Sequence, residues 1–389
     1  MPPARNASCR HLVCFSHLRW DFVWQRPQHL LSRAAENFCV IVVEEPIFED
    51  GASPHMRLRQ AMPGVTVAQP ILSKGTDPAL LDGLQRRVLD EMLASSGVRE
   101  MIAWYYTPLA IPFTSHLDRR VIVYDCMDEL SGFRGASPRL ALLERHLLKQ
   151  AHVVFTGGVS LYRSKRGLHR NVHAFPSSID AAHFGKARSA LPEPSDQASV
   201  PRPRVGFFGV VDERMDTGLV EAVARLRPEI SFVMIGPVVK IDPASLPRLP
   251  NIHWLGMKAY AELPSYLAGW QAGFMPFAMN EATRFISPTK TPEYLAAGVP
   301  VVSTPIADVV DPYGKEELVA IAGTPEAMAA ALDRLLAGVP ADWRARVDLR
   351  LRRMSWNRTW SEMLALIEEA ERGSDAVPAE RAQDGAAHV

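Results

Sequence analysis

The sequence predicts an α/β protein built from two doubly wound, Rossmann-like domains that face a central cleft. At 389 residues the chain is long for a single hydrophobic core. Short apolar, β-branched runs alternate with helical patterns, which is typical of parallel sheets covered by helices. Over residues 183–204 the periodicity disappears and Pro and Ser accumulate. We therefore expect an interdomain linker there, beside a functional cleft.

Apolar runs place the strands of the first domain. They are residues 11–16, 38–44, 65–68, 101–105, 121–124 and 153–155. Helical spacing of apolar side chains predicts helices over 80–93 and 140–148, and a further helix ends near Ala35. This alternation of strand and helix indicates parallel strands.

The second domain shows the same alternation. Its predicted strands are residues 204–208, 231–235, 251–255, 272–277, 301–302 and 318–320. Helices are predicted over 263–270, 292–297, 325–336 and 356–371, between or after these strands. Each domain can therefore form one sheet covered on both faces.

Composition excludes several classes of protein. The chain has 43 basic and 43 acidic residues, so its charge implies no polyanion partner, and we expect no nucleic acid. Cys9, Cys14, Cys39 and Cys126 include no C-x-x-C pair, and we expect reduced thiols in a cytoplasmic protein. No signal-peptide core and no apolar run long enough to span a bilayer is visible, so we expect a soluble protein or one that sits on a membrane surface.

The stretch from Ser287 to Thr304 predicts an anion site. Pro292 suits the first turn of a helix, and Gly298 with Pro300 ends that helix before the strand that begins at Val301. The free N–H groups and the dipole of such a helix end attract anions. Ser287, Thr289 and Lys290 supply donors before or at this end, and Glu293 supplies an acceptor in the first turn.

This stretch resembles the nucleotide-sugar signature of GT-B glycosyltransferases. The resemblance implies that Glu293 binds the donor ribose and that Lys290 and Thr289 face the diphosphate. Many retaining GT-B enzymes carry a second glutamate, but Phe285 stands at that position here, and Glu281 lies nearby out of register. The alternative is an ordinary turn between a helix and a strand, with a glutamate that suits the helix dipole.

The loop after the first strand is dense in polar and aromatic side chains. Residues 15–31 resemble the opening of bacterial glycosyltransferases associated with surface polysaccharides. The resemblance implies that this loop lines the acceptor and transfer site, through His17, Arg19, Trp24, Arg26 and Gln28. The alternative is that the aromatic side chains pack the domain and the arginines are solvated.

Carboxylates follow the strand 121–124. A transferase that activates a hydroxyl needs a base within hydrogen-bond reach. A similar Asp-rich turn in related GT-B enzymes suggests Asp128 for this role, with Glu129 or Asp125 as alternatives. An aspartate after a strand is also a common turn or helix-capping residue.

The remaining predicted donor residues follow strands of the second domain. The resemblance places Arg214 against the diphosphate, although Val210 replaces a second cation that such enzymes often carry. Gly209 and Gly236 end strands and let the backbone approach a ligand. Glu281 lies at the predicted entrance to the cleft, where it could contact the donor sugar. No metal-ligand cluster and no Asp-x-Asp pair occurs, so we expect no metal cofactor.

A cluster of basic residues precedes the predicted linker in the sequence. It comprises Arg163, Lys165, Arg166, His169 and Arg170. It is either a solvated face, which we favour, or a contact with anionic lipid or a lipid-linked acceptor at the inner membrane face.

Together these patterns predict a domain layout and an activity. We expect a first, acceptor-side domain over residues 1–182, the linker over 183–204 and a nucleotide-sugar domain over 205–354. A helix over 355–372 would cross back to the first domain, and a disordered tail would cover 373–389. The resemblance implies metal-independent sugar transfer from a UDP-linked donor to a glycan or lipid-linked hydroxyl. The alternatives are a nucleotide-sugar epimerase of the same fold and a non-catalytic nucleotide-sugar-binding subunit.

Overall fold

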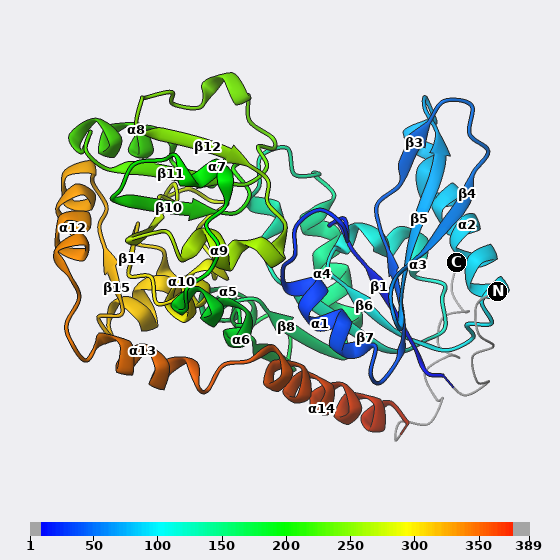
Figure 1. Cartoon of the computed structure of the whole chain (residues 1–389). Coiled ribbons are helices and arrows are strands. Elements are labelled where there is room, and N and C mark those ends of the chain that lie inside the picture. Colours follow the sequence, from blue (N-terminus) through cyan, green and yellow to red (C-terminus); the bar gives the residue numbers. More distant parts are fainter. Residues whose placement is uncertain (1–8, 376–389) are drawn as a thin grey trace.

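The computed structural model describes residues 9–375, which form two lobes with one sheet each (Figure 1). The first sheet has the order β3-β5-β2-β1-β6-β7-β8-β9, with β4 antiparallel on β5 and every other pair parallel. Its strands are β1 His11–Phe15, β2 Cys39–Val43, β3 Ile47–Glu49, β4 His55–Met62, β5 Val65–Ser73, β6 Met101–Tyr105, β7 Arg119–Cys126, β8 Val153–Thr156 and β9 Val172–Ala174. Its helices are α1 Arg26–Ala34, α2 Leu81–Ser95, α3 Ile111–Thr114, α4 Leu140–Gln150 and α5 Val159–Lys165.

The second sheet is wholly parallel, in the order β12-β11-β10-β13-β14-β15. Its strands are β10 Arg204–Phe208, β11 Ser231–Ile235, β12 Ile252–Gly256, β13 Ala272–Met275, β14 Val301–Ser303 and β15 Val319–Ile321. Its helices are α8 Thr217–Leu226, α9 Leu263–Leu267, α10 Lys290–Ala297, α11 Ala307–Val309, α12 Pro325–Ala337 and α13 Trp343–Leu351. The predicted α/β class and the two doubly wound sheets are confirmed.

Both faces of each sheet are covered, which explains why the central strands are almost entirely apolar. Side chains of β1, β2 and β6 alternate between two buried clusters, one on each face of the first sheet. The C-terminal helix α14, Trp356–Asp375, lies outside the second lobe's sheet and packs against the first lobe (Figure 1). Trp356, Trp360, Met363 and Ile367 from this helix are buried in the first lobe's core.

The segment around the predicted interdomain linker, residues 183–204, contains short helices and is packed against the second lobe. It contains the short helices α6, Ala181–Gly185, and α7, Ser195–Ala198. The Gln197 side chain donates to the carbonyl of Tyr266 and accepts from the indole N–H of Trp270. These helices are short and polar, so hydrophobic periodicity does not predict them. The contacts that hold them in place come from the second lobe.

The sequence reading also missed part of the first sheet. Strands β3, β4 and β9 were not predicted, and β5 is nine residues long where the pattern indicated only 65–68. β4 carries Arg57, Arg59 and Gln60 on an exposed edge, a composition that protects edge strands from further pairing and conceals the apolar alternation. At the other end, residues 373–375 continue α14, and the rest of the predicted tail, 376–389, lies outside the described residues.

The cysteines correct one further expectation. Cys9 and Cys39 form a disulfide, whereas Cys14 and Cys126 are free and buried. The prediction that all four thiols are reduced is therefore wrong for the first pair. Among residues 9–375, no helix is long and apolar enough to cross a membrane.

Candidate functional site

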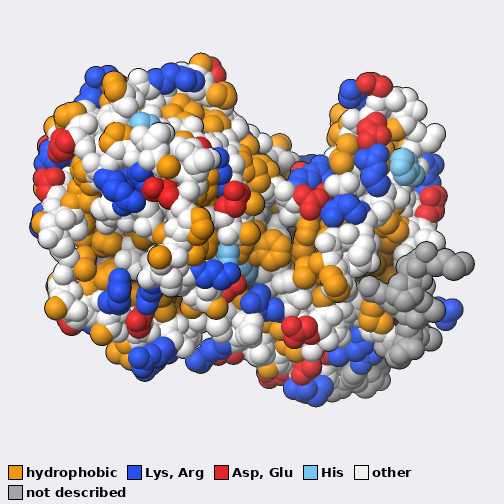
Figure 2. Space-filling model, viewed as in Figure 1, with side chains coloured by type: hydrophobic (Ala, Val, Ile, Leu, Met, Phe, Trp, Pro, Cys, Tyr) orange, Lys and Arg blue, Asp and Glu red, His pale blue; other side chains and the backbone are white. Residues whose placement is uncertain are grey.

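A cavity of about 440 Å³ lies between the two lobes, where the molecular surface is hollowed (Figure 2). It is lined by the loop that precedes α1, by the loop after β7, and by the loops after β10, β11 and β12. The beginning of α10 closes one wall. The carboxyl ends of parallel strands are where open α/β sheets bind ligands, so this cavity is the candidate functional site.

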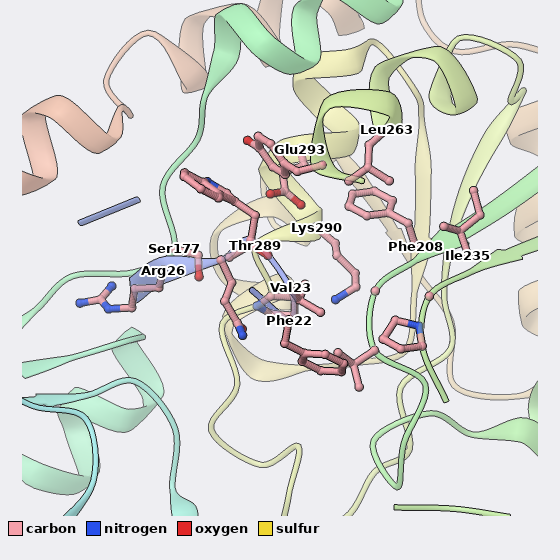
Figure 3. A pocket seen from close by; sticks show the side chains of 18 of the residues that line it. Phe22, Val23, Arg26, Ser177, Phe208, Ile235, Leu263, Thr289, Lys290 and Glu293 are labelled. Carbon is pink, nitrogen blue, oxygen red and sulfur yellow. The ribbon is translucent and has the colours of Figure 1, made fainter. Parts of the chain in front are cut away.

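Helix α10 brings the predicted donor residues together. Thr289 occupies its N-cap position, Lys290 begins the helix, and Glu293 lies in its first turn. Gly298 ends the helix in the left-handed conformation, with φ of 77°. Ser287, Thr289, Lys290 and Glu293 all line the cavity, as the sequence predicted. Figure 3 shows Thr289, Lys290 and Glu293 in this wall.

Two glycines bring the backbone of the second sheet up to Lys290. Gly209 follows β10 with φ of +134°, and a Cβ atom there would lie 2.1 Å from Cε of Lys290. Gly236 follows β11 with φ of +146°, and its Cβ would lie 1.8 Å from the carbonyl oxygen of Gly209. A side chain at Gly236 would collide with the backbone, and one at Gly209 would displace the end of the Lys290 side chain. The lysine amino group lies 5.5 Å from the ring centroid of Phe207 and 5.9 Å from that of Phe277.

The side chains of half-buried Lys290 and buried Glu293 face the cavity without an ion pair or hydrogen bond to another described residue. Burial and the neighbouring Arg214 lower the pKa of Lys290 to about 8. Burial raises the pKa of Glu293 to about 7, against the opposing effect of Lys290. The two side chains leave the same helix and border the space that Phe22, Val23 and Phe208 also border (Figure 3). The site thus offers one cation and one hydroxyl acceptor to a ligand.

Arg214 is the second predicted cation, and it also lines the cavity. Its guanidinium donates to both oxygens of Asp212, at 2.7–3.1 Å. It also lies 5.5 Å from the ring centroid of Phe133, which comes from the first lobe. Asp212 and Phe133 therefore hold the guanidinium at the boundary between the lobes.

Of the three carboxylates at the end of β7 and in the loop after it, only Asp128 lines the cavity. Burial raises the pKa of Asp128, while Arg214 opposes this shift. Asp125 is fully buried and paired with Arg26 at 2.8 Å. Glu129 is paired with Lys165 at 2.8 Å. The structure therefore leaves neither alternative free to act as a base.

The predicted acceptor loop is only partly at the cavity. Trp24 and Arg26 line it, whereas Arg19, Gln28 and His17 do not. Arg26 is 3% exposed, and three hydrogen bonds tie it to Asp125. It fixes the start of α1, and its predicted role in acceptor binding is not supported by this arrangement.

The three predicted residues that do not line the cavity, Arg19, Gln28 and His17, lie among other residues of the first lobe. Arg19 pairs with Glu44 at 3.2 Å. The Gln28 amide donates to the Trp20 carbonyl at 2.8 Å. Burial lowers the pKa of His17 to about 4, and its Nδ1 is buried without a partner among the described residues. His17 is therefore neutral near pH 7 and lies behind the cavity wall.

Glu281 is also displaced from its predicted place. Its side chain is 75% exposed, pairs with Arg284 at 3.4 Å and does not line the cavity. The loop after β13 directs this side chain away from the cavity. The sequence alone does not predict the course of that loop. The predicted donor contact of Glu281 is not supported.

Sequence reasoning missed Tyr260, which lines the cavity after β12. Its ring stacks on His183 at a centroid distance of 4.2 Å and lies 5.9 Å from the Trp24 ring. Its position after a strand's carboxyl end was the available signal. Over the described part of the chain, no group of three or more His, Cys, Asp or Glu side chains could hold a metal ion.

Comparisons with known proteins give a consistent assignment. Residues 202–338 match the family described as Glycosyl transferases group 1. TuaH of Bacillus subtilis (strain 168), described as a glycosyltransferase of teichuronic acid biosynthesis, is 27% identical over 234 residues. That match covers 56% of this chain and 59% of TuaH, so the chain matches less than two thirds of this relative's length.

Solved structures share the fold over nearly the whole chain. An α,α-trehalose-phosphate synthase (UDP-forming) from Burkholderia xenovorans superposes with a TM-score of 0.69 at 14% identity, covering 92% of this chain and 100% of that one. An E. coli trehalose-6-phosphate structure bound with UDP-2-fluoro glucose gives 0.66 at 14% identity, covering 93% and 99%. Anabaena HepE in complex with UDP and glucose gives 0.61 at 13% identity, covering 92% and 99%. The second lobe therefore matches a glycosyltransferase family, and the whole chain shares the two-lobe GT-B fold of these solved glycosyltransferase structures.

Proposed function

We propose that the protein transfers a sugar from a UDP-linked donor to a hydroxyl of a glycan or lipid-linked acceptor, without a metal ion. The observation that carries this proposal is the pair Lys290 and Glu293 on the first turn of α10, unpaired and facing one cavity. A helix N-terminus with a lysine suits a diphosphate. The buried carboxylate of Glu293, in the same first turn, suits a pair of ribose hydroxyls.

The lining residues divide into three roles in this proposal. Lys290, Arg214 and the N–H groups of α10 would stabilise the departing diphosphate, an electrostatic role that often dominates catalysis. Glu293 would accept hydrogen bonds from the ribose. Gly209 and Gly236 would let the backbone approach the nucleotide.

Asp128 would act as the base in a transfer that inverts the anomeric carbon. Its carboxylate takes the proton of the acceptor hydroxyl as that oxygen bonds to the anomeric carbon. The bond from this carbon to the diphosphate oxygen breaks, and its electron pair leaves with the diphosphate. The raised pKa of Asp128 makes it a stronger base than an exposed aspartate.

The comparisons support the donor and acceptor classes by analogy. The E. coli and Anabaena structures hold UDP-2-fluoro glucose, and UDP with glucose, respectively. TuaH is described as a glycosyltransferase of teichuronic acid biosynthesis. These properties belong to those proteins, and for this chain they select the substrates to test first.

The test is sugar transfer by wild type, Asp128→Asn and the control Asp21→Asn, followed by mass spectrometry of the glycoside and of released UDP. Asp21 also lines the cavity, but its side chain is 68% exposed. We expect Asp128→Asn to lower kcat by about 10²–10⁴-fold with unchanged UDP affinity, and Asp21→Asn to stay within about threefold of wild type. Equal activity of wild type and Asp128→Asn would remove Asp128 from the mechanism. Sugar-nucleotide conversion that needs no acceptor would indicate an epimerase.

A further inference from the structure

The middle of the chain carries a charge imbalance that the whole chain hides. Residues 130–179 contain eight Lys and Arg residues and one acidic residue, Glu144, which gives a net charge of +7. The remaining residues contain 35 basic and 42 acidic side chains, which gives −7 and leaves the total at zero. This positively charged segment belongs to the first lobe.

Contacts within the first lobe decide which of these cations face solvent. Lys165 is 4% exposed and bonds both oxygens of Glu144 at 2.8 Å. This contact consumes the segment's one carboxylate and fixes α5 against α4. The charge of the surrounding cations is then left without a local counterion.

Four cations remain exposed on α4 and on the turn after α5. They are Arg145, Lys149, Arg166 and Arg170, which are all exposed and form no ion pair with another described residue. The turn lies against the end of α4, because Nε2 of His169 is 3.0 Å from the carbonyl oxygen of Ala151. The turn that carries Arg166 and Arg170 therefore adjoins the end of α4 that carries Lys149.

Two leucines lie on the same two elements. Leu142 of α4 is 63% exposed, and Leu168 of the turn is 60% exposed. Both belong to the most exposed large apolar side chains of the described residues. Exposed leucines among unpaired cations are the composition of a surface that adsorbs to anionic bilayers.

We propose that this basic patch, formed by Arg145, Lys149, Arg166 and Arg170 with Leu142 and Leu168, docks the protein on an anionic lipid bilayer. The cations attract the headgroups, and the leucines insert at the boundary with the acyl chains. The helix α5 begins two residues after Gly157, which lines the cavity. The patch itself adjoins the amino ends of β8 and β9, at the edge of the sheet opposite the cavity, so docking is independent of the donor site.

For this basic cluster, the structure favours contact with lipid over the solvated face that the sequence alone favoured. A solvated basic face is normally interspersed with carboxylates, whereas here the local carboxylate is turned inward. A net charge of zero for the whole chain gives no general attraction to polyanions. Binding is then expected from this patch alone.

The test is cosedimentation of the full chain with vesicles of phosphatidylcholine, or of an equimolar mixture of phosphatidylcholine and phosphatidylglycerol. The patch variant is Lys149→Gln, Arg166→Gln and Arg170→Gln. The matched control is Arg248→Gln, Arg334→Gln and Arg344→Gln, three exposed cations of the second lobe. Both variants change the net charge equally.

We expect binding to the anionic vesicles only, weakened by added salt. One basic residue at an anionic surface strengthens binding about fivefold, so the patch variant should bind about 100-fold more weakly than wild type. The control variant should bind within about threefold of wild type. Leu142→Ser with Leu168→Ser should weaken binding about tenfold, whereas Leu80→Ser with Leu349→Ser, equally exposed elsewhere, should leave it unchanged.

Several results would overturn the proposal. They are equal binding to both kinds of vesicle, equal loss in the patch and control variants, and binding to soluble dextran sulfate without binding to either vesicle. Thermal stabilisation by UDP, measured on the same variants, separates this inference from the proposed function. A patch variant that keeps its UDP response but loses the vesicles supports docking, and a wild-type chain that binds vesicles but not UDP refutes only the donor site.

Discussion

At the scale of single residues, the site depends on two ionisable side chains, half-buried Lys290 and buried Glu293, that form no ion pair or hydrogen bond with the described residues. The pKa values of Lys290 and Glu293 move toward each other, to about 8 and about 7, chiefly because burial disfavours both charged forms. Unpaired buried charge destabilises a folded protein. Retaining it at a cavity is reasonable where a ligand supplies the missing partners.

This reasoning predicts how the stability of the ligand-free protein depends on pH. The pKa of Glu293 rises from 4.5 to about 7 on folding. Between about pH 4.5 and pH 7 the unfolded chain has lost a proton that the folded chain keeps, so the wild-type free energy of unfolding falls as pH rises. Glu293→Gln has no such proton, and its stability relative to wild type should increase across this window.

Urea denaturation of both proteins at several pH values within that window measures the difference. The pKa of Lys290, at about 8, lies above the window, so its own titration should contribute little. A stability difference that stays constant, or that changes in favour of wild type, would show that Glu293 does not titrate as described.

Gly209 gives a second prediction at this scale. Gly209→Ala should lower UDP affinity by tenfold or more, because the new Cβ would collide with Lys290. Gly338→Ala is the matched control, since Gly338 has φ of +128° and open space around it. Both substitutions should cost about 1–3 kcal/mol of stability from backbone strain, but only the first should affect calorimetric UDP titrations. Equal UDP affinity of the two variants would argue against the close approach.

Individual site residues could be predicted from sequence where the local pattern fixes them. Thr289, Lys290 and Glu293 lie within one short helix start, so turn and capping chemistry places them correctly. Arg26 and Glu281 could not be placed in this way. The partner of Arg26 is Asp125, 99 positions away, and no local signal reveals that contact.

At the scale of elements, the buried pair of Arg26 and Asp125 anchors the start of α1 to the end of β7. Arg26 also donates to the carbonyl of Phe175 at 2.8 Å, so one guanidinium joins three segments. The loop that carries Trp24 into the cavity ends at this anchor. Its position therefore depends on a contact behind the cavity wall.

Breaking this pair should be costly. Arg26→Met should lower the free energy of unfolding by about 3–5 kcal/mol, because it leaves a buried carboxylate uncompensated. The exposed pair of Arg59 and Asp21 is the control, and Arg59→Met should cost at most about 1 kcal/mol. Adding Asp125→Leu to Arg26→Met should recover part of the loss. Chemical denaturation measures all four proteins, and a loss below about 1 kcal/mol for Arg26→Met would contradict the anchor.

Element prediction succeeded where burial alone shapes the sequence. The central strands β1, β2, β6, β10 and β11 are buried on both faces and read as continuous apolar runs. The exposed edge strand β4 and the short helices α6 and α7 are stabilised by partners distant in sequence. Their own residues show too little hydrophobic periodicity to predict these elements.

At the scale of the whole molecule, two similar lobes present the carboxyl ends of their strands to one cavity. Helix α14 leaves the second lobe and buries Trp356 and Trp360 in the first, so the chain crosses between the lobes twice. The Ser177 hydroxyl of the first lobe also donates to the carbonyl of Ser287 at 2.6 Å. The lobes therefore meet through both covalent crossings and direct contacts beside the cavity.

This arrangement makes nucleotide binding the central claim, and a thermal-shift panel tests it most directly. Wild type, Glu293→Ala and Glu326→Ala are each heated with UDP, GDP, ADP or TDP. Glu326 is the matched control, because it lies in the first turn of α12 and is exposed. A ligand at 100 times its Kd adds about 2.7 kcal/mol to the folded state.

We predict that UDP stabilises wild type and Glu326→Ala alike. Glu293→Ala should lose about 1.5–3 kcal/mol of binding free energy, since its carboxylate would accept hydrogen bonds from the ribose. Absence of stabilisation of wild type by any of the four nucleotides, or equal stabilisation of wild type and Glu293→Ala, would contradict a donor site at the start of α10.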